Sequence, residues 1–107
     1  MAYSWMTAVG SAKLHLGSCE QAVAWFQRAI EANRNNSSAY LNLASALAQL
    51  GRLDEAHSAV KAGLALNRTY TVSRRRASWT ARSDDPTYLA QLEPILKGLR
   101  KAGVPEQ

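Results

Sequence analysis

Hydrophobic positions along this chain recur every three or four residues, which is the spacing of one face of an α-helix. Between residues 3 and 36 the pattern predicts two helices separated by a stop at Gly17, with Ser18 and Gln21 in the capping-box arrangement that starts the second. Between residues 37 and 70 it predicts two more helices, separated by a stop at Gly51. Each pair is expected to form a helical hairpin. The positions that carry the pattern are Met6, Val9, Gly10, Leu14 and Leu16; Ala22, Val23, Phe26, Ala29 and Ile30; Tyr40, Leu43, Ala44, Leu47 and Leu50; and Leu53, Ala56, Val60, Gly63 and Leu64.

The two predicted hairpins are copies of one another, because residues 3–36 can be laid on residues 37–70 without a gap. Small residues then recur at matched offsets in both halves. Helices approach closely only where side chains are short, so we expect these residues to mark the helix contacts. They are Gly10, Ala22, Ala29, Ala44, Ala56 and Gly63. A repeat of about 34 residues predicts an all-α solenoid of tandem antiparallel helical hairpins, with these two segments as its first two units.

The regular period ends after Tyr70. Residues 71–79 lie where the first helix of a third unit would begin, and Ser83-Asp84-Asp85-Pro86 then interrupts the pattern. Solenoids need an end that hides the last apolar face. We therefore expect residues 71–103 to form a degenerate third repeat and a capping helix, which gives about six helices in all.

The capping helix has its own start and stop signals. Asp85 as N-cap and Pro86 at the first helical position predict its beginning, and Gly103 predicts its end. Pro94 removes one backbone hydrogen bond inside it, and so predicts a kink or a break into two short helices.

Residues that carry catalysis or bind metals are sparse. The two histidines, His15 and His57, fall in different predicted helices and have no Cys, Asp or Glu at metal-ligand spacing. The one cysteine, Cys19, has no disulfide partner and fits a small buried hydrophobe. No phosphate-binding glycine loop, nucleophile elbow or dinucleotide fingerprint occurs. We therefore expect no enzyme, no metal and no cofactor within these residues.

The first residues and the hydropathy of the chain indicate its cellular location. No apolar run is long enough to span a membrane, and the first residues lack the basic and apolar segments of a signal peptide. The pattern favours a cytoplasmic protein without a membrane partner. Because the first repeat begins directly after Met1-Ala2, we expect a fragment excised from a longer protein.

Positive charge collects where the repeat pattern ends. Residues 1–67 carry five Lys or Arg and four Asp or Glu, so all but one of the net +5 charges lie after them, with a peak at Arg74-Arg75-Arg76. Three interpretations stay open: a solvated helix face, a surface for an acidic peptide or protein, and a nucleic-acid surface. Nucleic acid is disfavoured because there is no recognisable reading helix and, apart from Trp79, little interleaving of aromatic with basic residues.

The repeat resembles the tetratricopeptide repeat. That family places a bulky residue early in the first helix, then Leu-Gly or Leu-Ala, an Ala opening the second helix, an aromatic residue four positions later, and another Ala. The matching residues are Met6, Val9-Gly10, Ala22, Phe26 and Ala29 in the first unit, and Tyr40, Leu43-Ala44, Ala56, Val60 and Gly63 in the second; the closing Pro of the family is Arg34 and Arg68 here. The resemblance implies a right-handed superhelix whose concave wall is made by the first helix of each pair and binds peptides.

Mapped onto this sequence, the wall implied by the resemblance is polar with a cationic end. It would present Asn42, Arg75 and Arg76 as amide and guanidinium donors to a peptide backbone or carboxylate. Gln49 and Trp79 would support them. The remaining positions of the wall are Thr7, Ser11, His15 and Ser45. We expect a scaffold that binds a protein or peptide partner, acidic in character, and we expect replacement of both arginines by Ala to weaken that binding without unfolding the chain.

Two further functions stay open. Residues 51–56 and 96–106 are similar to the C-terminal repeat regions of bacterial class III adenylate cyclases and of winged-helix regulators, which would make the chain a regulatory region of a signalling protein. Alternatively, exposed apolar ends of the array would make it a self-association module. In that case Trp5, Val72 or Trp79 would pair across the two-fold axis of a homodimer.

Overall fold

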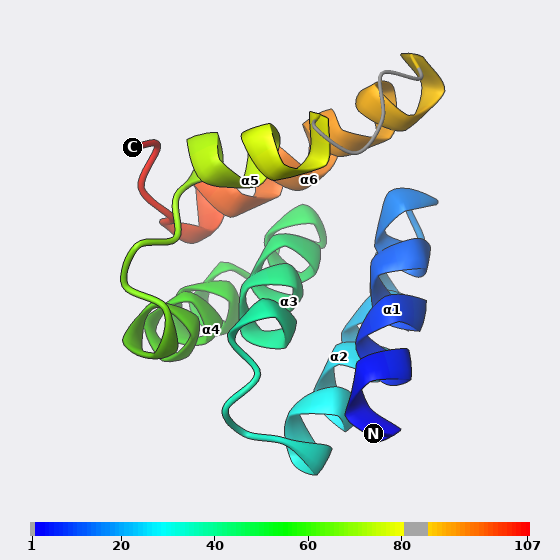
Figure 1. Ribbon diagram of the computed structural model, residues 1–107, viewed down its shortest axis with the longest axis vertical. Coiled ribbons are helices and arrows are strands. Elements are labelled where there is room, and N and C mark those ends of the chain that lie inside the picture. The colour runs from blue at the N-terminus through cyan, green and yellow to red at the C-terminus, as the bar shows by residue number, and fades with distance from the viewer. Residues whose placement is uncertain (1, 81–85) are drawn as a thin grey trace.

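The computed structural model describes the backbone of residues 2–80 and 86–107, and the side chains of residues 5–77, 86–87 and 90–107 (Figure 1). Within these ranges every regular secondary-structure element is a helix, which confirms the all-α prediction. The helices are α1 (Ala2–His15), α2 (Cys19–Ala32), α3 (Ser37–Gln49), α4 (Leu53–Leu66), α5 (Val72–Thr80) and α6 (Pro86–Ala102).

The predicted glycine stops are confirmed by the backbone geometry. Gly17, Gly51 and Gly103 have φ angles of 81°, 82° and 104°, in the left-handed region that residues with a Cβ rarely adopt. At each stop, the glycine N–H and the next residue's N–H both donate to carbonyls of the last helical turn, as in a Schellman motif. The turns after α1 and α3 therefore have the same geometry, 34 positions apart in the sequence.

Small residues lie where the paired helices touch, as the sequence predicted. A Cβ added to Gly10 would lie 2.7 Å from the ring of Phe26, and one added to Gly63 would lie 2.6 Å from Leu41. Ala22, the alanine that opens α2, is completely buried. Helices α1 and α2, and likewise α3 and α4, thus form closely packed hairpins whose contacts require short side chains.

The last two helices depart from the repeat. Helix α3 stacks on α2, but α5 does not stack on α4 in the same way; among the described residues its close packing partner is α6. Helix α6 instead lies against α3, with further contacts to α1 and α4 (Figure 1). Its buried face is apolar and consists of Leu92, Ile95, Leu96, Leu99 and Ala102. The C-terminal helix therefore covers the inner helices of the array.

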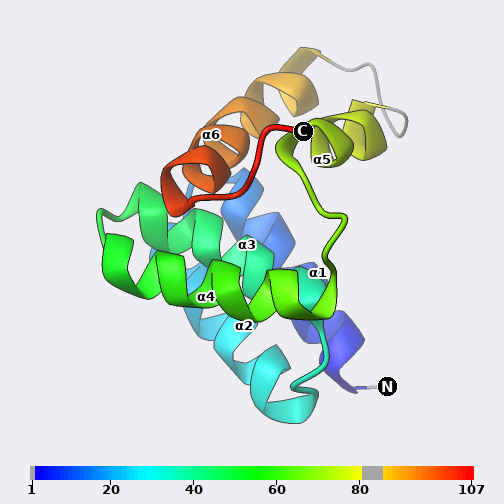
Figure 2. The same ribbon diagram turned by 90° about the vertical axis from the view of Figure 1, so that its left-hand side faces the viewer.

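The C-terminal tail joins the two halves of this last hairpin. Backbone N–H groups of Val72 and Ser73, at the start of α5, donate to the carbonyls of Pro105 and Glu106. Figure 2 shows the tail running from the end of α6 to the first turn of α5. Because the first N–H groups of a helix have no partner within it, the tail satisfies donors that would otherwise need water.

Two local predictions need correction. Ser18 is the residue before α2, but its side chain makes no capping hydrogen bond. Helix α6 is not broken at Pro94 but continues from Pro86 to Ala102. Pro94 lies on the exposed side of α6, where water can satisfy the carbonyl that loses its partner. Asp85, the predicted N-cap of α6, lies outside the described residues.

Candidate functional site

The predicted inner wall is largely covered by α6. The hydroxyl of Ser45 in α3 donates a 2.7 Å hydrogen bond to the carbonyl of Ile95 in α6, and Ser45 is completely buried. Gly98 makes the close approach possible, because a Cβ there would lie 2.6 Å from the Ser45 Oγ and 2.7 Å from its carbonyl oxygen. The middle of α3, which the resemblance assigned to a peptide, is here in contact with the chain's own last helix.

Asn42 and Arg75 are brought together as a buried pair. The Arg75 Nη1 donates to Asn42 Oδ1 over 2.5 Å and to the hydroxyl of Tyr70 over 3.3 Å. Asn42 is 4% exposed and Arg75 is 8% exposed. Their polar groups connect α5 to α3, and they do not face open solvent in this conformation.

The other predicted residues lie apart from that pair. Arg76 is exposed and pairs with Glu93 of α6 over 3.2 Å. Gln49, at the end of α3, is half-buried and donates to the Ser45 Oγ over 3.3 Å. The side chain of Trp79 lies outside the described residues, although its backbone belongs to α5.

Two residues that the resemblance assigned to the wall in α1 also have internal contacts. The hydroxyl of Thr7 accepts a 2.9 Å hydrogen bond from the side chain of Asn36, which in turn caps α3 by accepting from the Ala39 N–H. His15 lies near Arg75, and both its burial and that positive charge lower the pKa of the imidazole, while a hydrogen bond with Gln91 acts in the opposite direction. The neutral form of His15 is therefore favoured in the folded chain.

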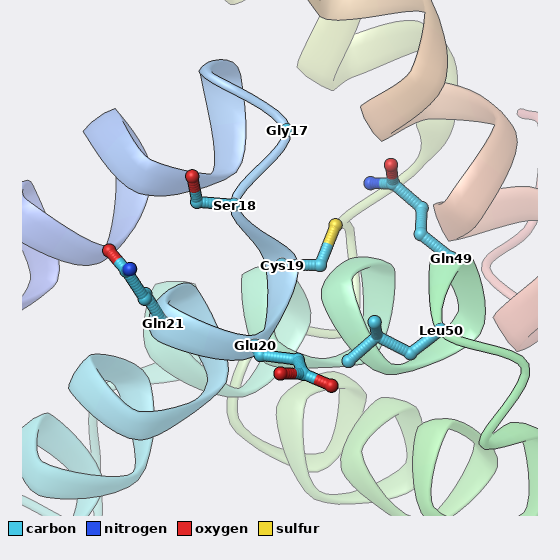
Figure 3. Close-up of a pocket in the computed structure, with 7 residues that line it drawn as sticks. All are labelled: Gly17, Ser18, Cys19, Glu20, Gln21, Gln49 and Leu50. Carbon is cyan, nitrogen blue, oxygen red and sulfur yellow. The ribbon is translucent and has the colours of Figure 1, made fainter.

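Open surface remains beside the covered part of the wall. A hollow of about 510 Å³ lies between the turn from α1 to α2 and the end of α3, with Cys19 and Gln49 on opposite sides of it (Figure 3). A second hollow of about 170 Å³ lies between α3 and α6, and Gln49 lines this one as well. The residues around the first are Gly17, Ser18, Cys19, Glu20, Gln21, Gln49 and Leu50, and those around the second are Gln49, Pro94, Lys97, Gly98 and Lys101. We call these two hollows together the Gln49 trough.

Lys97 and Lys101 give one end of the trough a positive charge. Both are exposed on α6, and neither forms an ion pair within the described part of the chain. Arg100 on the same helix differs, because its guanidinium makes two hydrogen bonds of 2.9 and 3.0 Å to the carboxylate of Glu106. That contact raises the pKa of Arg100 and lowers the pKa of Glu106. Of these three cationic side chains on α6, Lys97 and Lys101 are thus the two whose charge is available to a partner at the trough.

Sequence reasoning missed both lysines. The only signal that could have found them is the amphipathic pattern of α6, whose polar stripe contains Lys97 and Lys101 opposite the buried leucines. Cys19 was expected to be a buried small hydrophobe, and it is 8% exposed, with burial raising the pKa of its thiol. A thiol of this kind is less nucleophilic than a free one at neutral pH.

The described residues contain no group of three or more His, Cys, Asp or Glu side chains that could hold a metal ion. In the same residues, no helix has the length and apolar character that crossing a bilayer requires.

Comparison with known families agrees with the architecture. Two family models, both described as tetratricopeptide repeat, match residues 6–36 and residues 25–58. No curated protein and no solved structure matches the chain. The comparisons give no support to an origin in an adenylate cyclase or a winged-helix regulator. Two stacked helical hairpins, glycine stops 34 positions apart and two matching family models together show that residues 6–58 of this chain are similar to tetratricopeptide repeats.

Proposed function

We propose that this chain is a protein-interaction module that binds an extended, acidic peptide segment in the Gln49 trough. Tetratricopeptide repeats suggest a protein-interaction scaffold in general, and the trough supplies a specific surface for it. The observation that carries the proposal is that Gln49 lines both hollows while Lys97 and Lys101, at one end, form no ion pair with any other described residue.

The chemistry of the trough suits a peptide. A side-chain amide such as that of Gln49 can both donate to and accept from a peptide backbone. The lysine ammonium groups can donate charge-assisted hydrogen bonds to Asp, Glu or a terminal carboxylate. Leu50 and Cys19 supply apolar area in the larger hollow, where a hydrophobic side chain of the peptide can be buried. The trough therefore favours a ligand with an apolar residue a few positions from an acidic one.

Asn42 and Arg75 take a different part in this proposal from the one the sequence implied. Both donate or accept within the fold, so they hold α5 against α3 and thereby position α6, which forms one side of the trough. Arg76 stays a candidate peptide contact, because its side chain is exposed and its pairing with Glu93 lies at the solvent boundary. An acidic peptide that extends along α6 would compete with Glu93 for this arginine.

The proposal is tested with the 107-residue chain and a displayed random peptide library. We expect the selected peptides to be enriched in Asp and Glu. The double variant Lys97→Ala, Lys101→Ala should bind the strongest selected peptide about tenfold more weakly in fluorescence anisotropy, since two exposed charge contacts contribute about 1 kcal/mol or less each. The loss should shrink at high salt, because exposed charges are screened.

A matched control separates the trough from net charge. Lys61→Ala with Arg68→Ala removes the same two positive charges from exposed positions of the second repeat, and should leave the affinity within about twofold at high salt. Gln49→Ala should also weaken binding. Equal losses for the two double variants, or selected peptides without acidic residues, would rule out the trough as the site.

A further inference from the structure

Two polar residues one turn apart in α3 form a chain of hydrogen bonds that leads from α6 to the Gln49 trough. The Ser45 hydroxyl donates to the Ile95 carbonyl over 2.7 Å, and the side-chain amide of Gln49 contacts the Ser45 Oγ over 3.3 Å. Ser45 is completely buried, whereas Gln49 is half-buried and lines both hollows. The orientation of the Gln49 amide therefore depends on what the buried hydroxyl can donate or accept.

The positions of the protons in this chain follow from the chemistry of its groups. A carbonyl oxygen only accepts hydrogen bonds, so the single proton of the Ser45 hydroxyl lies in the bond to Ile95. The Ser45 Oγ has no second proton and can only accept from Gln49. If the amide were turned over, two oxygen atoms would face each other with no proton between them. The Nε2 of Gln49 is consequently directed at Ser45, and its Oε1 is directed away from Ser45.

The carbonyl oxygen of the Gln49 side chain is left open by the fold. Its amide nitrogen bonds to Ser45, and Oε1 accepts no hydrogen bond from any residue that the structure describes. The repeat equivalent of Gln49 in α1 is His15, which is hydrogen-bonded to Gln91 of α6. The second repeat thus carries an open acceptor at an inner position where the first repeat carries a side chain bonded to α6.

We propose that Ser45 is a positioning residue that makes Gln49 a fixed hydrogen-bond acceptor, so that the trough selects a peptide with a free backbone N–H at that point. This inference rests on the proposed function, because it specifies the ligand of the same site. The second proton of Nε2 stays available, so the amide can pair with both the N–H and the C=O of an extended peptide. Proline or an N-methylated residue at that point lacks the N–H and leaves Oε1 unpaired after the peptide has displaced water.

The bond to Ser45 provides the discrimination. An amide held only by its own side chain could turn over and present its NH₂ group, and would then accept a peptide carbonyl in place of a peptide N–H. The bond to Ser45 also restricts the Gln49 side chain in the free protein, so less conformational entropy is lost when the peptide binds. We therefore expect the peptide to carry a residue other than proline where it passes Gln49, next to the acidic residue that reaches Lys97 and Lys101.

The specificity is tested on the strongest acidic peptide selected with the 107-residue chain, by methylating its backbone nitrogens one at a time. We expect one position at which methylation weakens binding about tenfold or more in fluorescence anisotropy. In Gln49→Met, which replaces the amide by a thioether of similar length, the same methylation should weaken binding less than about threefold. The matched control is Gln27→Met at an exposed position of α2, which should keep the full loss. Equal losses in Gln49→Met and the unchanged protein would overturn the proposal.

The role of Ser45 is tested by selectivity and by spectroscopy. Ser45→Ala also loses the bond to Ile95, so the informative quantity is the ratio of affinities for the unmethylated and methylated peptides, which should fall to that of Gln49→Met. The unchanged protein gives a second test that needs no variant and no peptide. Nuclear Overhauser contacts should connect the Nε2 protons of Gln49 to the Ser45 side chain. An unchanged ratio in Ser45→Ala, or Nε2 protons remote from Ser45, would overturn the positioning role.

This inference and the proposed function fail in different ways. Selected peptides without acidic residues would remove the trough as the binding site, and this specificity with it. An acidic peptide that binds at the trough, but has no methylated position coupled to Gln49, would overturn the specificity alone and leave the proposed function standing.

Discussion

The adjacent arginines Arg75 and Arg76 offer the sharpest test of how the last hairpin is held. Arg75 is buried and hydrogen-bonded to Asn42 of α3, whereas Arg76 is exposed and paired with Glu93. The two substitutions Arg75→Ala and Arg76→Ala delete the same side chain from neighbouring positions of one helix. Differences in helix propensity cancel between them, so the comparison isolates the effect of burial.

The magnitude follows from the contacts. Loss of a hydrogen bond from a charged donor to a buried acceptor costs about 1.5 to 3 kcal/mol, and Arg75→Ala also removes the apolar part of a packed side chain. Release of a buried guanidinium from its desolvation offsets part of this loss. We expect Arg75→Ala to lower the free energy of unfolding by about 2 kcal/mol, which for a chain of this size lowers the melting temperature by about 8 °C. For Arg76→Ala we expect less than about 1 kcal/mol.

Urea unfolding followed by circular dichroism measures both values, with the midpoint reporting stability and the slope reporting whether the unfolded state changes. A double-mutant cycle with Asn42→Ala isolates the contact, and we expect a coupling energy of about 1 kcal/mol or more between Asn42 and Arg75. If Arg75→Ala costs no more than Arg76→Ala, or if the cycle gives no coupling, the buried pair does not hold α5 to α3. The same data bear on the sequence-based expectation that replacing both arginines leaves the fold intact, because the structure predicts that Arg75 alone destabilises it.

Two other predictions concern the contact between α6 and the inner helices. Gly98→Ala should lower the free energy of unfolding by about 1 to 3 kcal/mol in urea titrations, because the new Cβ would meet the Ser45 backbone at 2.7 Å. At a helix position free of such contact, the same change would instead raise the free energy of unfolding by about 1 kcal/mol. A raised urea midpoint would show that α6 does not pack this closely on α3. His15 has a pKa below its ordinary value of 6.5, so below that value the unfolded chain binds more protons than the folded one, and stability should fall as the pH drops from 7 through 6.5 to the lowered pKa. Unfolding measured across this range should lose part of its pH dependence in His15→Gln and keep it in His57→Gln, and the opposite pattern would refute the assignment to His15.

The sequence predicted the first four helices because their signals are local. A glycine in the left-handed conformation ends α1 and α3, and small residues such as Gly10 and Gly63 mark the points where each hairpin closes. The position of α6 could not be found in this way. Its leucines show that one face is buried, but a pattern of apolar residues does not say which helix buries it. The repeat suggested stacking at the end of the array, and the chain folds back over α3 instead.

The candidate site illustrates the same limit at the level of single residues. Asn42 and Arg75 were both placed on the inner wall from the resemblance, and they do lie side by side. Residue type alone does not distinguish a polar side chain that binds a ligand from one that is hydrogen-bonded within the fold, because the same donor and acceptor groups serve both purposes. The distinction depends on what covers the wall, and in this chain the cover comes from residues 86–102.

Helix α5 does not stack on α4 as α3 stacks on α2, and residues of both α4 and α5 explain why. In α2, Val23 is 5% exposed in the hairpin that α3 covers, whereas its repeat equivalent in α4 is His57, which is exposed. Helix α5, which would have to stack there, is short and carries Arg74-Arg75-Arg76 in place of apolar residues. Stacking α5 on α4 would therefore bury little apolar area and would desolvate charged groups. Helix α6 has the leucines that α5 lacks, so packing α6 on α3 buries more apolar area than stacking α5 on α4 would. The hydrogen bond between Arg75 and Asn42 then holds α5, the helix next to α6, against α3.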